Sequence, residues 1–270
     1  MSQNVAGEPG GPRGREHYRR LLAAVEIPQR SRGGSLEAVL ERADALARGR
    51  ALDLPSGPGR LSEALRRLGF GAVAADLDAA GFQAPRVPFC VADLEGPLPF
   101  ATGCFVLAHC GDGIEHLENP FAVLRELARV LDDEGVLLVT TPNYGNVGRR
   151  VQFLLTGAVS KPPRRAPGYA SGPRFDRGHI NPMTPARLAY AAESAGLELV
   201  EMTTLLPRRR QWWLAPLALA IHLYARTLSA ARREDLFADR TQSARMLLGG
   251  KKLVVALRKR RASPPAVGRC

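Results

Sequence analysis

A glycine-containing turn and two later aspartates occur in an order that suits the binding of a nucleoside. The turn lies in residues 52–60 (LDLPSGPGR), where Gly57 and Gly59 have no Cβ and therefore let backbone and ligand approach closely. Asp76 follows about 17 residues beyond Gly59, and its carboxylate can accept both hydroxyl protons of a ribose. Asp93 lies near the end of a third apolar run, where a carboxylate can accept a hydrogen bond from an adenine amino group. This order predicts an adenosyl ligand, and a turn with a purely structural role is the alternative.

The predicted ligand lacks a pyrophosphate. A dinucleotide-binding turn follows the pattern G-x-G-x-x-G or G-x-G-x-x-A, which would place glycine or alanine at position 62. Ser62 stands there instead, so the sequence disfavours NAD.

The elements that must position these residues are predicted from short apolar runs that alternate with amphipathic ones. Continuous apolar runs of strand length, separated by helical periodicity, indicate parallel strands buried on both faces. The predicted strands are ALDL (51–54), GAVAADL (71–77), VPFCVADL (87–94), CFVLAHC (104–110), GVLLVTT (135–141), LELVEMTTL (197–205) and KKLVVALRK (251–259). The pattern predicts an α/β fold with a doubly wound, seven-stranded, mostly parallel sheet and a helical insert before the last strand.

Composition and periodicity divide the chain into four segments. We expect residues 1–34 to be a mobile N-terminal segment and a helix, 35–206 the ligand-binding core, 207–248 the helical insert, and 249–270 the last strand with a basic tail. Within the core, residues 144–183 form a long connection rich in Gly, Pro and Arg. Because this connection follows the C-terminal end of a central strand, where such sheets bind ligands, we expect it to cover the active site.

Charge and cysteine usage bear on the cellular setting. The net charge of +12 permits attraction to nucleic acid, anionic lipid or an acidic substrate and does not choose among them. The cysteines (Cys90, Cys104, Cys110 and Cys270) form no CxxC pair, and three lie in or beside predicted buried strands, which indicates core thiols in a reducing compartment. The first residues contain no apolar segment of the kind that directs export, so a cytoplasmic location is predicted.

Taken together, the motifs resemble those of class I S-adenosylmethionine (SAM)-dependent methyltransferases, which have a Rossmann-like fold. The resemblance runs from Arg50 to about Gly196, and is to the broad group that includes ubiquinone-biosynthesis O-methyltransferases and many natural-product and glycan methyltransferases. The segments that carry it are LDLPSGPGR (52–60), AADLD (74–78), VADLEGPLPF (91–100), GDGIEHLENP (111–120), RVLDDEGVLLVTTPN (129–143) and HINPMTPARL (179–188). Two residues depart from the group's pattern. Pro55 replaces the first glycine of the turn and removes a backbone donor, and Val106 stands where Asp commonly follows phenylalanine.

The resemblance implies that residues 35–206 bind SAM as a methyl donor. The implied cofactor-binding residues are Asp53, Gly57 and Gly59 on the methionine side, Asp76 and Leu77 at the ribose, Asp93 and Leu94 at the adenine, and Cys110 and Gly111 near the methyl group. The implied activity is methyl transfer to a small-molecule or lipid-like acceptor, with a hydroxyl oxygen as the expected acceptor atom.

Methyl transfer from a sulfonium needs a nucleophile held close and in line, and a hydroxyl nucleophile is helped by a base. His116, directly after Glu115, is the first candidate for that base, and His179 is the second. The structural alternatives are that His116 caps or pairs near the start of the helix predicted at 120–131, and that His179 makes a hydrogen bond within its loop.

Asp112, Glu115 and His116 also suggest a metal site. Their spacing resembles the acidic-x-x-Glu-His segment that binds a divalent cation in the ubiquinone-pathway enzymes, and the donor types suit Mg²⁺ or Zn²⁺. The Glu-His pair also occurs in the wider group without a metal.

The helical insert combines basic and apolar residues. Three arginines at 208–210 precede Trp212 and Trp213, and the apolar run that follows (214–225) is shorter than the roughly 20 residues of a membrane-spanning helix. Tryptophans beside arginines are typical of a helix that lies in a membrane interface, so the insert predicts docking on an anionic membrane surface and access for a lipid-linked acceptor. The basic tail can add to this attraction. A helical flap packed on the sheet or on a partner subunit is the alternative.

Two other functions are weighed against a small-molecule or lipid-directed enzyme. A nucleic-acid methyltransferase is disfavoured, because TTPN (140–143) lacks the Asn/Asp-Pro-Pro-Tyr/Phe signature and no basic patch interleaved with aromatic residues occurs. A catalytically silent scaffold that holds a partner through the insert receives some support from Pro55.

Overall fold

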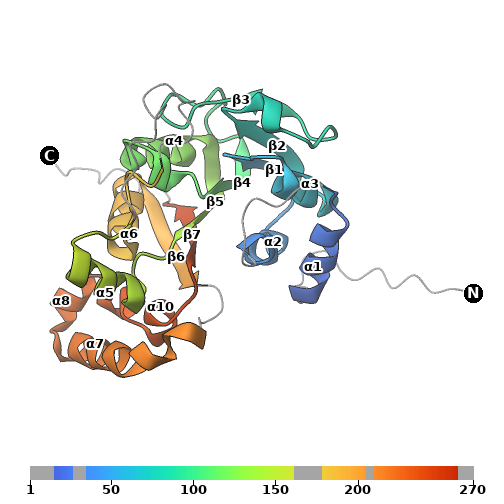
Figure 1. The fold of residues 1–270 in the computed structure, drawn as a ribbon. Coiled ribbons are helices and arrows are strands. Elements are labelled where there is room, and N and C mark those ends of the chain that lie inside the picture. The colour runs from blue at the N-terminus through green and yellow to red at the C-terminus, as the bar shows by residue number, and fades with distance from the viewer. Residues whose placement is uncertain (1–14, 27–34, 161–177, 205–208, 261–270) are drawn as a thin grey trace, which may run out of the picture.

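A single seven-stranded sheet forms the centre of the fold (Figure 1). The computed structural model describes residues 15–26, 35–160, 178–204 and 209–260. The strands, in the order β3-β2-β1-β4-β5-β7-β6, are β1 (Arg50–Asp53), β2 (Gly71–Asp76), β3 (Phe89–Val91), β4 (Phe105–Gly111), β5 (Leu131–Pro142), β6 (Leu197–Thr204) and β7 (Lys252–Lys259). Strand β7 pairs antiparallel with β5 and β6, and the other neighbours pair in parallel. The predicted doubly wound, mostly parallel sheet is confirmed.

Helices cover both faces of this sheet (Figure 1). The α-helices are α1 (Arg15–Ala23), α2 (Ser35–Asp44), α3 (Arg60–Arg67), α4 (Pro120–Val130), α5 (Val147–Thr156), α6 (Pro185–Ser194), α7 (Ala215–Thr227), α8 (Ala230–Asp235), α9 (Ala238–Thr241) and α10 (Ala244–Leu247). The 3₁₀ helices are η1 (Ala79–Gly81), η2 (Ile114–His116) and η3 (Arg209–Leu214).

The core has two layers because successive strand residues point to opposite faces. Ala51 and Leu107 are buried with the apolar residues of α1, α2 and α3. Their neighbours Leu52 and Ala108 are buried on the other face with those of α4 and α6. Strands that are buried on both faces explain the continuous apolar runs of the sequence.

Helix starts follow local capping. The Thr184 hydroxyl accepts a hydrogen bond from the Arg187 N–H at the start of α6, as its position before Pro185 predicts. At α4 the cap is Asn119, whose side chain accepts from the Ala122 N–H. The interpretation of His116 as the cap of that helix is therefore wrong, because Asn119 adjoins the first helical residue and His116 ends the preceding 3₁₀ turn.

The predicted helical insert lies between β6 and β7 and consists of η3 and α7–α10. None of the described helices is long and apolar enough to cross a membrane. The insert contacts α5 at one end, where the Asn146 amide donates to the Gln211 side-chain oxygen at 2.8 Å. Residues 161–177 of the predicted cover, the N-terminal residues 1–14 and the tail at 261–270 lie outside the described residues.

Candidate functional site

A cavity of about 470 Å³ opens at the carboxyl ends of β1, β2 and β4. The strand order reverses between β1 and β4, and open α/β sheets bind ligands at such a switch point. The loops after β1 to β4 form most of its wall, and Ser35 and Leu36 of α2 close one side. The sequence contained no signal for this contribution of α2, because the residues lie outside the strand–helix repeat.

The turn after β1 depends on its two predicted glycines for different reasons. Gly57 has φ +51° and lines the cavity. Gly59 has φ +86° and precedes the first residue of α3, and a Cβ at this position would lie 2.5 Å from Phe82 and 2.8 Å from Ala84. Gly59 is not among the lining residues, so its requirement for glycine comes from the turn and from close packing.

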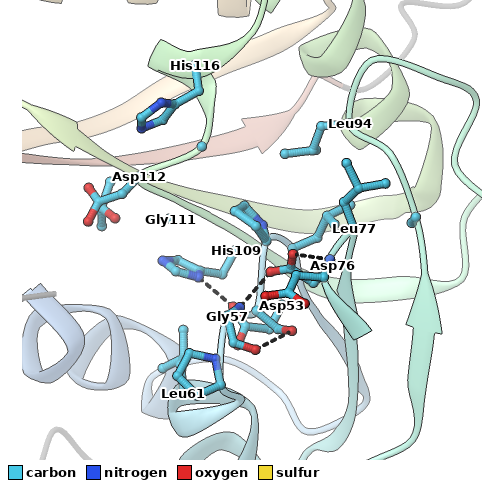
Figure 2. A pocket seen from close by; sticks show the side chains of 18 of the residues that line it. Asp53, Gly57, Leu61, Asp76, Leu77, Leu94, His109, Gly111, Asp112 and His116 are labelled. Atoms are coloured by element: carbon cyan, nitrogen blue, oxygen red, sulfur yellow. Dashed lines mark hydrogen bonds and ion pairs between the residues drawn. The ribbon is translucent and has the colours of Figure 1, made fainter. Parts of the chain in front are cut away.

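Asp76 ends β2 beside this turn (Figure 2). Its Oδ2 accepts from the Gly57 N–H at 2.7 Å, and its Oδ1 accepts from the Asp78 N–H at 3.0 Å. The carboxylate therefore ties the turn to β2 and keeps further lone pairs for a ligand. Leu77, the next residue, also lines the cavity.

Asp93 and Leu94, the residues predicted to hold the adenine, lie just past the end of β3 and line the same cavity. The Asp93 Oδ1 accepts from the Glu95 N–H at 2.9 Å, which fixes the loop. The apolar side chain of Leu94 lines the cavity together with Leu77, and Figure 2 labels both residues.

A buried hydrogen-bonded pair joins β1 to β4 at the base of the cavity. Asp53 Oδ1 lies 2.8 Å from His109 Nδ1, and the Ser62 hydroxyl donates to Asp53 Oδ2 at 2.6 Å. Asp53 and His109 both line the cavity, and Figure 2 shows them facing each other. Sequence reasoning selected Asp53 but missed His109.

Gly111 and Cys110 at the end of β4 separate in the structure. Gly111 lines the cavity, whereas the Cys110 side chain is fully buried in the core between the sheet and α4. Burial raises the pKa of the Cys110 thiol well above its usual range, with smaller contributions from the Glu115 and Asp112 carboxylates. The prediction that Cys110 lies along the cofactor does not hold for its side chain, because alternation along the strand directs residues 109 and 111, and not 110, toward the cavity.

The predicted catalytic residues lie together beyond the end of β4. The rings of His116 and His179 are 4.9 Å apart, and His179 Nδ1 lies 2.8 Å from the Tyr144 hydroxyl. Glu115 is buried and accepts from the Thr141 hydroxyl at 3.0 Å. Of the three predicted residues, His116 alone is among the lining residues of the cavity.

Burial sets the protonation of this cluster. Burial, with a smaller effect of Asp112, raises the pKa of Glu115 to about 7. Burial and then the neighbouring His116 lower the pKa of His179, which favours its neutral imidazole. Burial also raises the pKa of Tyr144, so this hydroxyl keeps its proton. Tyr144 was missed because it lies in the connection after β5, where no periodicity marks it.

The candidate metal donors differ from those predicted. Oxygen and nitrogen atoms of Glu115, His116 and His179 lie within 4.8 Å of one another. Asp112 is not in this group and forms an ion pair with Lys252. The predicted set of Asp112, Glu115 and His116 is therefore corrected to one in which His179, from a distant segment, replaces Asp112.

Comparison with known proteins gives matches across most of this region. The family model described as "Methyltransferase domain" matches residues 18–202. The ubiquinone biosynthesis O-methyltransferase of Xanthomonas oryzae pv. oryzae (strain PXO99A) is 34% identical over 117 residues, which are 40% of this chain and 48% of that protein. The enzyme of the same description from Xanthomonas euvesicatoria pv. vesicatoria (strain 85-10) is 29% identical over 180 residues, which are 63% of this chain and 71% of that protein.

A solved structure shows the same fold at low identity. The SAM-dependent methyltransferase from Archaeoglobus fulgidus superposes with a TM-score of 0.53 and 16% identity, over 83% of this chain and 95% of that chain. Because the chain spans about half the length (48%) of the first relative above, that protein's activity and substrate do not transfer with the match alone.

Proposed function

Because this chain belongs to the methyltransferase domain family, we propose that it binds SAM in the cavity and transfers the methyl group to an acceptor. The observation that carries the proposal is the placement of Asp53, Asp76 and Asp93 at the ends of neighbouring strands around one cavity. Asp76 would hold the ribose hydroxyls, and Asp93 with Leu94 the adenine. Bound SAM supplies an electrophilic methyl group on a sulfonium.

The acceptor atom we propose is a hydroxyl oxygen. The support is the O-methyltransferase description of the relatives and the position of His116 on the wall of the cavity. An imidazole there can take the proton of an acceptor hydroxyl as the oxygen attacks. The His179 ring contacts this imidazole edge-on and is itself paired with the Tyr144 hydroxyl, an arrangement that would help to hold His116 toward the acceptor.

Isothermal titration of SAM into the purified, folded protein tests the cofactor assignment. We expect binding in the micromolar range with one site per chain. Absence of binding to protein shown by circular dichroism to be folded would contradict the proposal.

A divalent cation held by Glu115, His116 and His179 is the alternative for the proton step, since one oxygen and two nitrogen donors suit Zn²⁺. Such a cation would acidify a bound hydroxyl. We expect protein treated with a chelator to keep its rate of methyl transfer, because His116 can take the proton without a metal. A loss of rate that Zn²⁺ restores would instead assign these donors to a cation.

We further propose that the acceptor is lipid-like and that the chain docks on an anionic membrane through an apolar surface, at the inner face of the membrane. This apolar surface consists of exposed side chains of α5, η3 and α7, namely Phe153, Leu154, Leu155, Trp212, Trp213, Leu219, Leu223 and Tyr224. The two tryptophans are 72% and 73% exposed, so they are not packed on the sheet. Helix α5 contacts η3, and η3 contacts α7, so these side chains lie on adjoining elements. Large apolar side chains exposed on adjoining elements favour interaction with a partner or a membrane.

The charge around the apolar surface favours anionic lipid. Residues 147–160 and 209–227 contain five arginines and no acidic residue. Basic residues beside interfacial tryptophans attract the headgroups of anionic lipids. Helix α5, which carries Phe153, Leu154 and Leu155, begins three residues after Tyr144, so this part of the apolar surface follows the proposed catalytic cluster along the chain.

Replacing both Trp212 and Trp213 by serine is expected to remove most of the binding to vesicles that contain phosphatidylglycerol, because two interfacial anchors are lost. Flotation of protein with the vesicles measures this. Tyr190→Ser is the matched control, since Tyr190 is 60% exposed on α6, outside the apolar surface, and should float like the wild type. Flotation of the double variant at the wild-type level, or no flotation of the wild type, would contradict membrane docking.

A further inference from the structure

His109 has one ring nitrogen paired and the other without a partner at the base of the cavity. The residue is 4% exposed, and its Nδ1 pairs with Asp53. Its Nε2 is buried and has no hydrogen-bond partner among the described residues. Buried polar atoms are nearly always hydrogen-bonded, so an unpaired one in a cavity wall points to a ligand.

The neighbours of Asp53 decide which group this nitrogen can bind. The Asp53 carboxylate accepts from the Ser62 hydroxyl and can accept, but not donate, toward His109. Nδ1 therefore donates to Asp53, and in the neutral imidazole this tautomer presents the Nε2 lone pair as an acceptor. With a carboxylate behind it, this acceptor favours a donor that carries positive charge.

Gly111 keeps space beside the ring. Residues 109 and 111 point to the same side of β4, and a Cβ at 111 would lie 2.3 Å from His109 Cε1 and 2.9 Å from Nε2. The position of the imidazole therefore requires glycine at 111, because any side chain there would collide with the ring.

The order of the strands indicates which part of the ligand reaches His109. Asp93 follows β3, Asp76 ends β2, and Asp53 and His109 lie on the adjacent β1 and β4. An extended ligand with its adenine at β3 and its ribose at β2 would direct its third part toward β1 and β4. For SAM that third part is the amino-acid end, which carries an ammonium group.

We propose that His109 is a cofactor-positioning residue that accepts a hydrogen bond from the α-ammonium group of SAM, supported from behind by Asp53 and Ser62. This inference rests on the proposed function. It assigns to His109 and Gly111 a joint role in selecting ligands with an intact amino-acid end over ligands that share only the adenosine and the sulfur.

Two ligands separate this role from a general effect on the fold. S-adenosylhomocysteine retains the ammonium group, and 5′-methylthioadenosine has the same nucleoside and sulfur without the amino-acid end. For His109→Leu we expect at least a tenfold loss of affinity for the first by calorimetry, and less than a twofold change for the second. Gly111→Ala, whose Cβ would displace the His109 ring from its present position, should give the same selective loss.

The results distinguish a failure of the role proposed for His109 from a failure of SAM binding as such. Equal losses for both ligands would assign His109 to the structure of the cavity and overturn the inference, as would unchanged affinity for S-adenosylhomocysteine. Where His109→Leu does not fold, His109→Gln, which can still donate to Asp53, provides the comparison. Failure of the wild type to bind either ligand would overturn the proposed function, and this inference with it.

Discussion

Asp76→Ala is expected to weaken the binding of SAM about a hundredfold. The carboxylate lies at the end of β2, where it can accept from two ribose hydroxyls in addition to the Gly57 and Asp78 N–H groups. A hydrogen bond to a charged group contributes about 1.5 kcal/mol or more, so the loss of two corresponds to roughly 3 kcal/mol. Calorimetric titration with SAM measures the change.

Asp78→Asn is the matched control for this prediction. Asp78 lines the same cavity and carries the same charge, but its carboxylate caps η1 by accepting from the Gly81 N–H. We expect its affinity for SAM to stay within threefold of the wild type. Equal weakening by both substitutions would show that the net charge of the cavity, rather than the Asp76 contacts, governs binding.

His116→Ala is expected to lower the rate of methyl transfer about a hundredfold and leave the affinity for SAM unchanged. General-base catalysis contributes roughly a hundredfold or more, and His116 is the cavity residue placed to supply it. Transfer of a radiolabelled methyl group from SAM into a membrane lipid extract measures the rate.

His222→Ala is the control for loss of an imidazole elsewhere. His222 lies on α7, where its Nδ1 pairs with the Gln242 carbonyl, and it does not line the cavity. Its removal should leave the rate near that of the wild type. A His116→Ala variant as fast as the wild type would remove His116 from the proton step.

Much of the fold could be predicted because parallel strands buried on both faces appear in the sequence as continuous runs of apolar residues. All seven predicted strands occur, yet their ends differ. Strand β5 begins at Leu131, four residues before the predicted start, because Leu131 pairs with Phe105 of β4. Such pairings are formed between distant segments and leave no local signal.

Some residues of the candidate site could be selected from local sequence patterns, and others depend on contacts between distant segments. Gly57, Asp76 and Asp93 follow predicted strands and could be selected from the sequence. His109 could have been found by alternation from Gly111, but its partner Asp53 is 56 positions away and is brought opposite by the β1–β4 register. A histidine within an apolar run is not recognisable as a site residue until that register is known.

The contacts of His179 could likewise not be predicted from local sequence patterns. His179 was selected from its motif, but its contacts with Tyr144 and His116 depend on how the segment before α6 returns to the end of β4. The role of α2 in the cavity wall depends on packing of the N-terminal helices against α3 and the sheet.

The reversed direction of β7 determines where this protein can vary. Because β6 runs parallel to β5 and β7 runs opposite to both, the segment between β6 and β7 leaves and re-enters the sheet at its carboxyl edge, the edge that carries the cavity. Insertions in the first part of this segment therefore leave the strand register unchanged, whereas its last helix, α10, contributes the buried Met246 to the core and must be retained. The docking element and the cavity can thus change independently, and a chimera that exchanges residues 209–237 while keeping α9 and α10 would retain the cavity and acquire a different docking element.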